Sequence, residues 1–133
     1  MAQRPRPAAT AVVVYAKDKD RVAEFYRQAL SLQLSEWEDG FSVLTGRGLE
    51  VSVVRMPEAL ARHLEIASPP ARREDTPIKA SFLVPGFDAV REAAAATGGA
   101  LGPPGAEWTW RGCVHLDGHD PEGNVVQFRR PAR

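Results

Sequence analysis

The sequence has very little cysteine: Cys113 is the only one in 133 residues. A single thiol excludes an intrachain disulfide and is typical of proteins in a reducing compartment. A buried, inert thiol is the simpler interpretation of Cys113, and a reactive thiol is the alternative.

Charge of one sign and long apolar runs are also missing. Seventeen basic residues balance seventeen acidic ones, so the formal net charge is zero. With this balance the chain has no excess of positive charge that would attract nucleic acid or an anionic membrane. No run reaches transmembrane length, and residues 1–10 lack the apolar stretch of a secretory signal. We therefore expect a cytoplasmic protein that binds neither nucleic acid nor membrane.

The chain length fits one domain, residues 1–133, with a sizeable core. Periodicity and turn signals predict the same order of elements twice, strand–helix–three strands. The first module covers 10–55 and the second covers 78–130, and a proline-containing connector with a possible short helix covers 56–77. The expected elements are strands at 11–16, 32–37, 41–45, 49–54, 78–84, 113–117 and 125–129, helices at 21–30 and 88–97, and a further segment at 108–110.

Strand parity separates two faces in the first and last strand of each module. One face is entirely apolar and must be covered by the two helices. It consists of Val12, Val14, Ala16, Leu49, Val51, Val53, Ala80, Phe82, Val84, Val126 and Phe128. The other face is mixed, and it is either a solvated sheet face or the lining of a small-molecule cavity. It consists of Ala11, Val13, Tyr15, Glu50, Ser52, Val54, Lys79, Ser81, Leu83, Val125, Gln127 and Arg129.

Two local motifs accompany this repeat. Phe25-Tyr26 lies in the first helix, and a turn with the sequence Asp-Pro-Glu-Gly-Asn at 120–124 leads into the closing strand. With the repeat, these motifs make the chain resemble the vicinal oxygen chelate superfamily, which includes glyoxalase I, extradiol dioxygenases and bleomycin-binding proteins. The resemblance extends from about residue 10 to residue 130. It implies an α+β fold in which the sheets of two βαβββ modules wrap around a shared cleft, and a homodimer.

In metal-dependent members of that superfamily, the first and last strands of each module supply the metal ligands. The resemblance places those positions at Ala11, Ser52, Lys79 and Gln127. Alanine offers no donor, lysine is a cation at neutral pH, and serine and glutamine are weak ligands. We therefore expect no metal centre of the family type and no cofactor.

The segment His115-Leu116-Asp117-Gly118-His119 offers a second possible metal site. His115, Asp117 and His119 would share one face of an extended strand and have suitable donor atoms. Against this, Gly118 and the following turn should end the strand before His119. The alternatives for His115 are a structural hydrogen bond or an acid–base role in the cavity.

Aromatic residues suggest what the cavity holds. Trp37, Trp108 and Trp110 lie in or beside middle strands, and with Tyr15 and Phe41 they either pack in the core or line a slot for a flat ligand. The predicted ligand-binding set is Tyr15, Trp37, Phe41, Glu50, Ser52, Lys79, Trp108, Trp110, His115, Gln127 and Arg129.

Two functions remain open from the sequence. The first is a metal-independent binding protein for a small aromatic molecule; the resemblance implies an antibiotic-like ligand and a role in drug sequestration or resistance. The second is an enzyme of the same superfamily that uses acid–base residues such as Lys79, Glu50 or His115, or a metal at a non-family site. A non-catalytic accessory subunit is a third interpretation.

Overall fold

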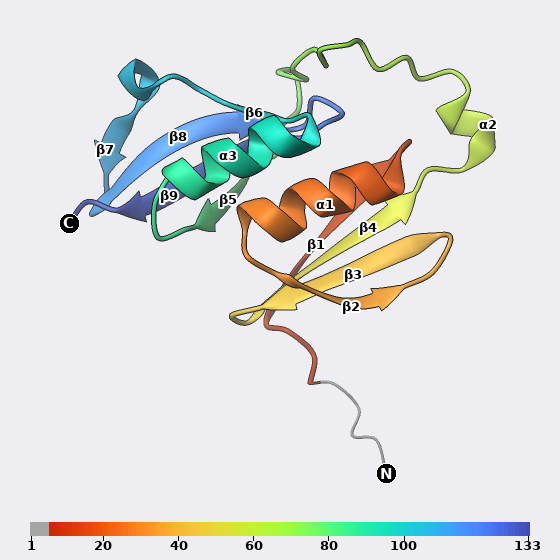
Figure 1. Cartoon of the computed structure of the whole chain (residues 1–133), viewed down its shortest axis with the longest axis horizontal. Coiled ribbons are helices and arrows are strands. Elements are labelled where there is room, and N and C mark those ends of the chain that lie inside the picture. The colour runs from red at the N-terminus through yellow and green to blue at the C-terminus, as the bar shows by residue number, and fades with distance from the viewer. Residues whose placement is uncertain (1–5) are drawn as a thin grey trace.

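The computed structural model describes residues 6–133 and has the α+β class predicted from the sequence. Two β-sheets and two main helices make up the fold, and α1 and α3 lie side by side in front of the sheets (Figure 1). The helices are α1 (Lys19–Ala29), α2 (Glu58–Ala61) and α3 (Asp88–Thr97), and Pro104–Ala106 forms a 3₁₀ turn. The strands are β1 (Thr10–Ala16), β2 (Gln33–Trp37), β3 (Phe41–Gly46), β4 (Leu49–Arg55), β5 (Ala80–Leu83), β6 (Ala100–Leu101), β7 (Trp108–Trp110), β8 (Cys113–His119) and β9 (Val125–Pro131). Within residues 6–133, no helix is long and apolar enough to cross a membrane.

The two sheets have the same topology. The first has the strand order β1-β4-β3-β2, and the second has the order β5-β9-β8-β6, with β7 also paired to β8. In each sheet the first strand of the module runs parallel to the last one. β6 and β7 thus share the place that β2 fills in the first module, separated by the 3₁₀ turn.

Strand register confirms the repeat at the level of single residues. Val13 lies opposite Ser52 in the first sheet, and Ser81 lies opposite Gln127 in the second. The sequence repeat aligns Val13 with Ser81 and Ser52 with Gln127, so these two pairs are equivalent positions of the two modules.

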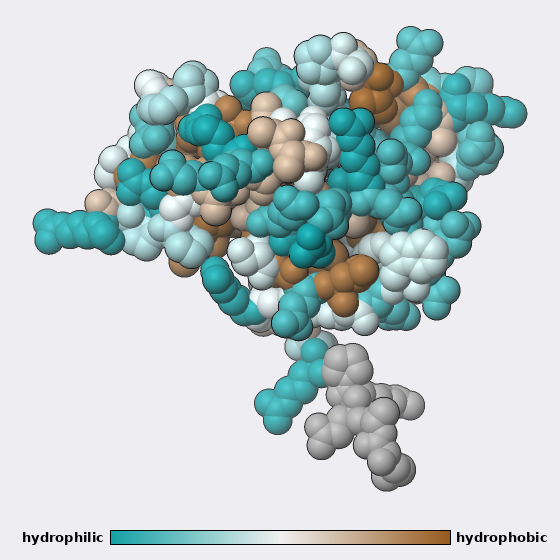
Figure 2. All heavy atoms as spheres, viewed as in Figure 1, coloured by the Kyte–Doolittle hydropathy of each residue, from teal (hydrophilic) through white to brown (hydrophobic). Residues whose placement is uncertain are grey.

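The predicted apolar face forms the core. Ala16, Val51, Val53, Phe82 and Phe128 are buried beneath the helices. The helices contribute their own apolar stripes to one continuous cluster. The rings of Phe25 and Phe128 lie 6.4 Å apart, and so do those of Tyr26 and Phe82, which places the aromatic pair of α1 against the second sheet. Hydrophilic residues predominate on the outer surface of the helices, where apolar residues appear as separate patches (Figure 2).

Three local expectations were wrong. β5 begins at Ala80 and not at residue 78, because its pairing with β9 starts there, and Ile78 is largely exposed. β8 does not end before His119, which pairs with Val125 on β9 and with Ala100 on β6. Cys113 is half-buried and not fully enclosed. The connector contains the expected short helix, α2, which is a single turn of four residues.

Candidate functional site

The mixed face of the second sheet brings together most of the predicted site residues of that module. On β8 and β9, His115 lies opposite Arg129, and Asp117 lies opposite Gln127. On β7, Trp108 lies opposite His115. Residues opposite each other in an antiparallel pair present their side chains on the same face. We call this surface the second mixed face; it consists of Lys79, Ser81, Leu83, Trp108, Trp110, Cys113, His115, Asp117, His119, Val125, Gln127 and Arg129.

His115 is the centre of this face and is almost fully buried. Its Nδ1 lies 3.1 Å from Gln127 Oε1, and its Nε2 lies 3.0 Å from the carbonyl oxygen of Trp110. The indole of Trp108 stacks on the imidazole with a centroid distance of 5.3 Å and an interplanar angle of 15°. The Trp110 ring lies 5.8 Å away, tilted by 50°. Both indoles stay largely open to solvent on their outer sides, with exposed fractions of 40% for Trp108 and 60% for Trp110.

Gln127 has the hydrogen-bond partner that its place in an apolar strand requires. The Ser81 hydroxyl donates to Gln127 Oε1 at 2.7 Å, and His115 contacts the same oxygen. Ser81, Gln127 and His115 therefore form a polar row across three neighbouring strands.

A second polar pair lies beside this row. Lys79 Nζ is 2.9 Å from Asp117 Oδ2 and 5.9 Å from the centre of the Trp108 ring. Asp117 Oδ1 is buried and has no hydrogen-bond partner among residues 6–133. A cavity of about 340 Å³ opens here, between the start of β5 and the connector. Its lining residues are Arg72, Arg73, Glu74, Thr76, Pro77, Lys79, Asp117 and Val125.

Predicted site residues of the first module lie on the mixed face of the first sheet. Strand pairing places Phe41 opposite Val54, and Tyr15 opposite the same residue, so both aromatic rings share this face with Glu50 and Ser52. Tyr15 is 59% exposed. Within residues 6–133, no ion pair joins Glu50 to Lys79 or Arg129; Lys79 pairs with Asp117 instead. The cleft shared by the two mixed faces stays a prediction.

Trp37 does not lie on either mixed face, which corrects the sequence expectation. A β-bulge between Leu34 and Glu36 shifts the register of β2, so Trp37 pairs with the buried Ser42. One extra residue reverses the alternation of all the side chains that follow. Trp37 Nε1 donates to Asp20 Oδ1 at 3.0 Å, and Lys19 Nζ lies 4.5 Å from the ring centre. Trp37 therefore lies on the face of the first sheet that the helices cover, where it contacts the first residues of α1. We call this face the helix side.

The four positions equivalent to the family's metal ligands do not fit a metal ion. Lys79 is engaged as a cation with Asp117, and Gln127 Oε1 already accepts a hydrogen bond from Ser81. Ala11 and Ser52 add no strong donor. His119 turns its Nδ1 to the carbonyl oxygen of Asp120 at 2.9 Å, away from a shared site with His115 and Asp117. Between residues 6 and 133, no group of three or more His, Cys, Asp or Glu is placed to hold a metal.

The Asp-Pro-Glu-Gly-Asn turn has a structural role. Asp120 is fully buried; its carboxylate accepts hydrogen bonds from the Tyr26 hydroxyl and from the backbone N–H groups of Glu122 and Asn124. The buried Glu122 carboxylate accepts hydrogen bonds from the backbone N–H groups of Lys17 and Asp18, at 2.8 Å and 2.6 Å. The turn thus connects the end of the second module to the β1–α1 junction of the first.

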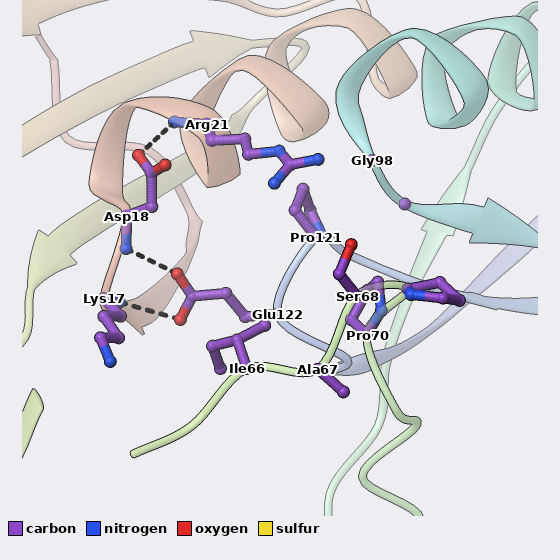
Figure 3. A pocket seen from close by; sticks show the side chains of 12 residues that line it. Lys17, Asp18, Arg21, Ile66, Ala67, Ser68, Pro70, Gly98, Pro121 and Glu122 are labelled. Atoms are coloured by element: carbon purple, nitrogen blue, oxygen red, sulfur yellow. Dashed lines mark hydrogen bonds between the residues drawn. The ribbon is translucent and has the colours of Figure 1, made fainter. Parts of the chain in front are cut away.

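A larger cavity of about 640 Å³ lies next to this turn (Figure 3). Its polar groups are largely satisfied within the chain. Both Glu122 oxygens are bonded, Lys17 Nζ donates to the carbonyl of Leu64, and Arg21 Nε donates to the carbonyl of Thr97. The smaller cavity adjoins the aromatic surface of Trp108 and most of the predicted site residues through Lys79 and Asp117, so it is the better candidate.

Sequence reasoning missed three contributors to this site. Ser81 was placed on the mixed face but not in the site, and Asp117 was considered as a metal ligand and not as the partner of Lys79. Arg73, in the connector, is not among the predicted site residues. The repeat alignment could have indicated Ser81, because that residue lies opposite Gln127.

Two βαβββ modules with parallel first and last strands, joined by the Asp120 turn, define the vicinal oxygen chelate class. The model of the glyoxalase-like domain family matches residues 11–128, and the chain belongs to this family. A search of the curated proteins found no match.

Solved structures with the same fold have low sequence identity to this chain. A glyoxalase/bleomycin resistance protein/dioxygenase family enzyme from Burkholderia phytofirmans PsJN is 20% identical, with a TM-score of 0.65 over 91% of this chain and 96% of that one. A glyoxalase/bleomycin resistance protein from Albidiferax ferrireducens T118 is 17% identical, with a TM-score of 0.63 and the same coverage. The oxidase ChaP-H2 is 19% identical, with a TM-score of 0.62 over 91% of each chain.

Proposed function

We propose that this chain is a metal-independent binding protein for a flat, aromatic small molecule, which lies on the second mixed face. The observation that carries the proposal is the exposed indole of Trp108, held rigid by stacking on the buried imidazole of His115. A fixed aromatic surface beside a row of polar groups suits a planar ligand with a few polar substituents.

The hydrogen bonds of His115 support binding over acid–base catalysis. Each ring nitrogen faces an oxygen atom of the chain, Gln127 Oε1 at 3.1 Å on one side and the Trp110 carbonyl at 3.0 Å on the other, so neither nitrogen points into open space. A general acid or base must have a nitrogen that reaches the substrate. The imidazole of His115 therefore serves as the support for the indoles.

Tryptophan fluorescence tests the proposal. The purified protein is titrated with a panel of planar aromatic compounds, including antibiotics, and we expect saturable quenching by some of them. Trp108→Ala should weaken binding about 5- to 150-fold, since stacking of one ring on an aromatic side chain contributes about 1–3 kcal/mol. Trp37→Phe is the matched control, because Trp37 lies on the helix side. Absence of saturable binding across the panel would refute the proposal.

The proposal extends to assembly and role. Val13, Tyr15, Leu83 and Trp110 are more than half exposed, and a homodimer would cover such apolar side chains. We propose a cytoplasmic homodimer that sequesters an antibiotic-like compound. Light scattering coupled to size exclusion checks the dimer: a monomeric mass at micromolar concentration contradicts it.

A further inference from the structure

The cavity beside the second mixed face has an uneven distribution of charge. Two of its cations are neutralised nearby: Arg72 Nε lies 3.4 Å from Glu74 Oε1, and Lys79 Nζ lies 2.9 Å from Asp117 Oδ2. Arg73 also lines the cavity and has no carboxylate within 4.0 Å in the part of the chain that the structure describes. Among residues 6–133, the guanidinium of Arg73 is therefore the cavity cation that no carboxylate compensates.

The backbone of Arg73 is held in place. Its N–H donates to the carbonyl oxygen of Gly123 at 2.8 Å, and Arg73 forms an isolated parallel bridge with Asn124. The connector is thus attached to the closing turn at this residue. Arg73 is half-buried, so its side chain extends from a fixed point along the cavity wall.

The cavity and the aromatic surface are adjacent, because Lys79 contributes to both. Its ammonium lies above the Trp108 ring and also lines the cavity. A ligand ring that stacks on Trp108 therefore lies beside Lys79, and Arg73 lines the same cavity as Lys79. A planar guanidinium binds a carboxylate through two parallel hydrogen bonds.

We infer that the ligand is an aromatic carboxylic acid, whose ring lies on Trp108 and whose carboxylate binds Arg73. This inference rests on the proposed function, since it names the ligand class for the same site. Lys79 is a weaker determinant, because Asp117 already compensates its charge. The preference for an anion over a neutral analogue therefore depends on Arg73.

The test uses two ligands of nearly the same shape, 2-naphthoate and neutral 2-naphthamide, with titration calorimetry on the full chain. We expect the native protein to bind the acid about tenfold more tightly than the amide. Arg73→Gln should lower the affinity for the acid more than the affinity for the amide, so that the two affinities come together. Arg72→Gln removes the same charge from the neighbouring residue and should keep the preference, because its guanidinium is paired with Glu74.

Each other outcome decides a different point. Equal affinity of the native protein for the two compounds overturns the carboxylate inference and leaves aromatic binding intact. A preference for the acid that survives Arg73→Gln overturns the role of Arg73. Binding of neither compound counts against aromatic binding itself, and with it against this inference. Circular dichroism of both variants establishes that they are folded.

Discussion

The hydroxyl of Tyr26 donates a 2.8 Å hydrogen bond to the carboxylate of Asp120. Tyr26 belongs to the helix of the first module, and Asp120 begins the closing turn of the second. Both side chains are buried, so the bond joins the two modules inside the core. The Phe25-Tyr26 pair and the 120–124 turn, the two sequence motifs on which the resemblance rests, are therefore in direct contact in the structure.

Removal of the Tyr26 hydroxyl should destabilise the fold. Tyr26→Phe leaves Asp120 Oδ2 with Asn124 Nδ2 as its remaining side-chain partner. A hydrogen bond to a charged group contributes about 1.5–3 kcal/mol, so the free energy of unfolding should fall by that amount. Urea denaturation measures the change. Tyr15→Phe is the control, because the Tyr15 ring is exposed. An equal effect of the two substitutions would contradict the structural role of the bond.

Stability should also fall at alkaline pH. Burial, followed by the negative charge of Asp120 and their hydrogen bond, raises the pKa of Tyr26 well above its ordinary value of 10.0. Above pH 10 the unfolded chain loses this proton while the folded chain retains it, so the unfolded state is favoured. The expected slope from this group is about −1.4 kcal/mol per pH unit above pH 10. Native protein and Tyr26→Phe, compared by denaturation between pH 8 and 11, should differ in slope by this amount; parallel curves would exclude the linkage.

Glu122 should act as a built-in cap for the β1–α1 junction. Glu122→Gln replaces one carboxylate oxygen by an amide N–H₂ group, which opposes the backbone N–H of Lys17 or Asp18. Loss of a charge-assisted bond at this buried position should cost about 1–3 kcal/mol of unfolding free energy. Thermal denaturation of Glu122→Gln should show a lower midpoint, whereas Glu65→Gln, on the exposed connector, should not change it.

Gly123 is needed both for its backbone angle and for the space around it. Its φ is +86°, and an added Cβ would collide with the carbonyl oxygen of Ala71. Gly112 has a φ of +75° with open space around it. Gly112→Ala should therefore cost only the left-handed backbone penalty, about 1–2 kcal/mol. Gly123→Ala should cost at least ~1 kcal/mol more, because the connector must move as well. Equal midpoints of urea denaturation for the two variants would contradict this close approach.

Much of the fold follows from periodicity. Alternation in the first and last strands identified the buried face, and the repeat alignment identified Ser52 and Gln127 as equivalent, which the register bears out. Trp37 shows the limit of this reasoning. A β-bulge adds one residue to β2, and no pattern in the sequence indicates it. The bulge moves Trp37 to the opposite face of the sheet.

The site was less predictable than the fold, for two physical reasons. The Lys79–Asp117 pair crosses from β5 over β9 to β8, so it depends on the registers of two strand pairs at once. Arg73 comes from a connector without periodicity, and a backbone bridge to Asn124 holds it in place. Such a bridge joins backbone groups, which do not depend on the side chain, so the amino-acid sequence does not indicate it.

Asp117 should oppose the binding of an anion at this site. Its carboxylate lies within the cavity wall and compensates Lys79. Asp117→Asn would free the charge of Lys79 for the ligand, and the affinity for 2-naphthoate should rise about two- to tenfold, which corresponds to about 0.4–1.4 kcal/mol. The affinity for 2-naphthamide should stay the same.

The fold should tolerate this substitution. Asp117 Oδ1 is buried without a hydrogen-bond donor among residues 6–133, so loss of the negative charge removes an unfavourable desolvation as well as the ion pair. Calorimetric titration of Asp117→Asn with both ligands measures the effect. Unchanged affinity for the acid would show that the carboxylate of the ligand does not approach the Lys79–Asp117 pair.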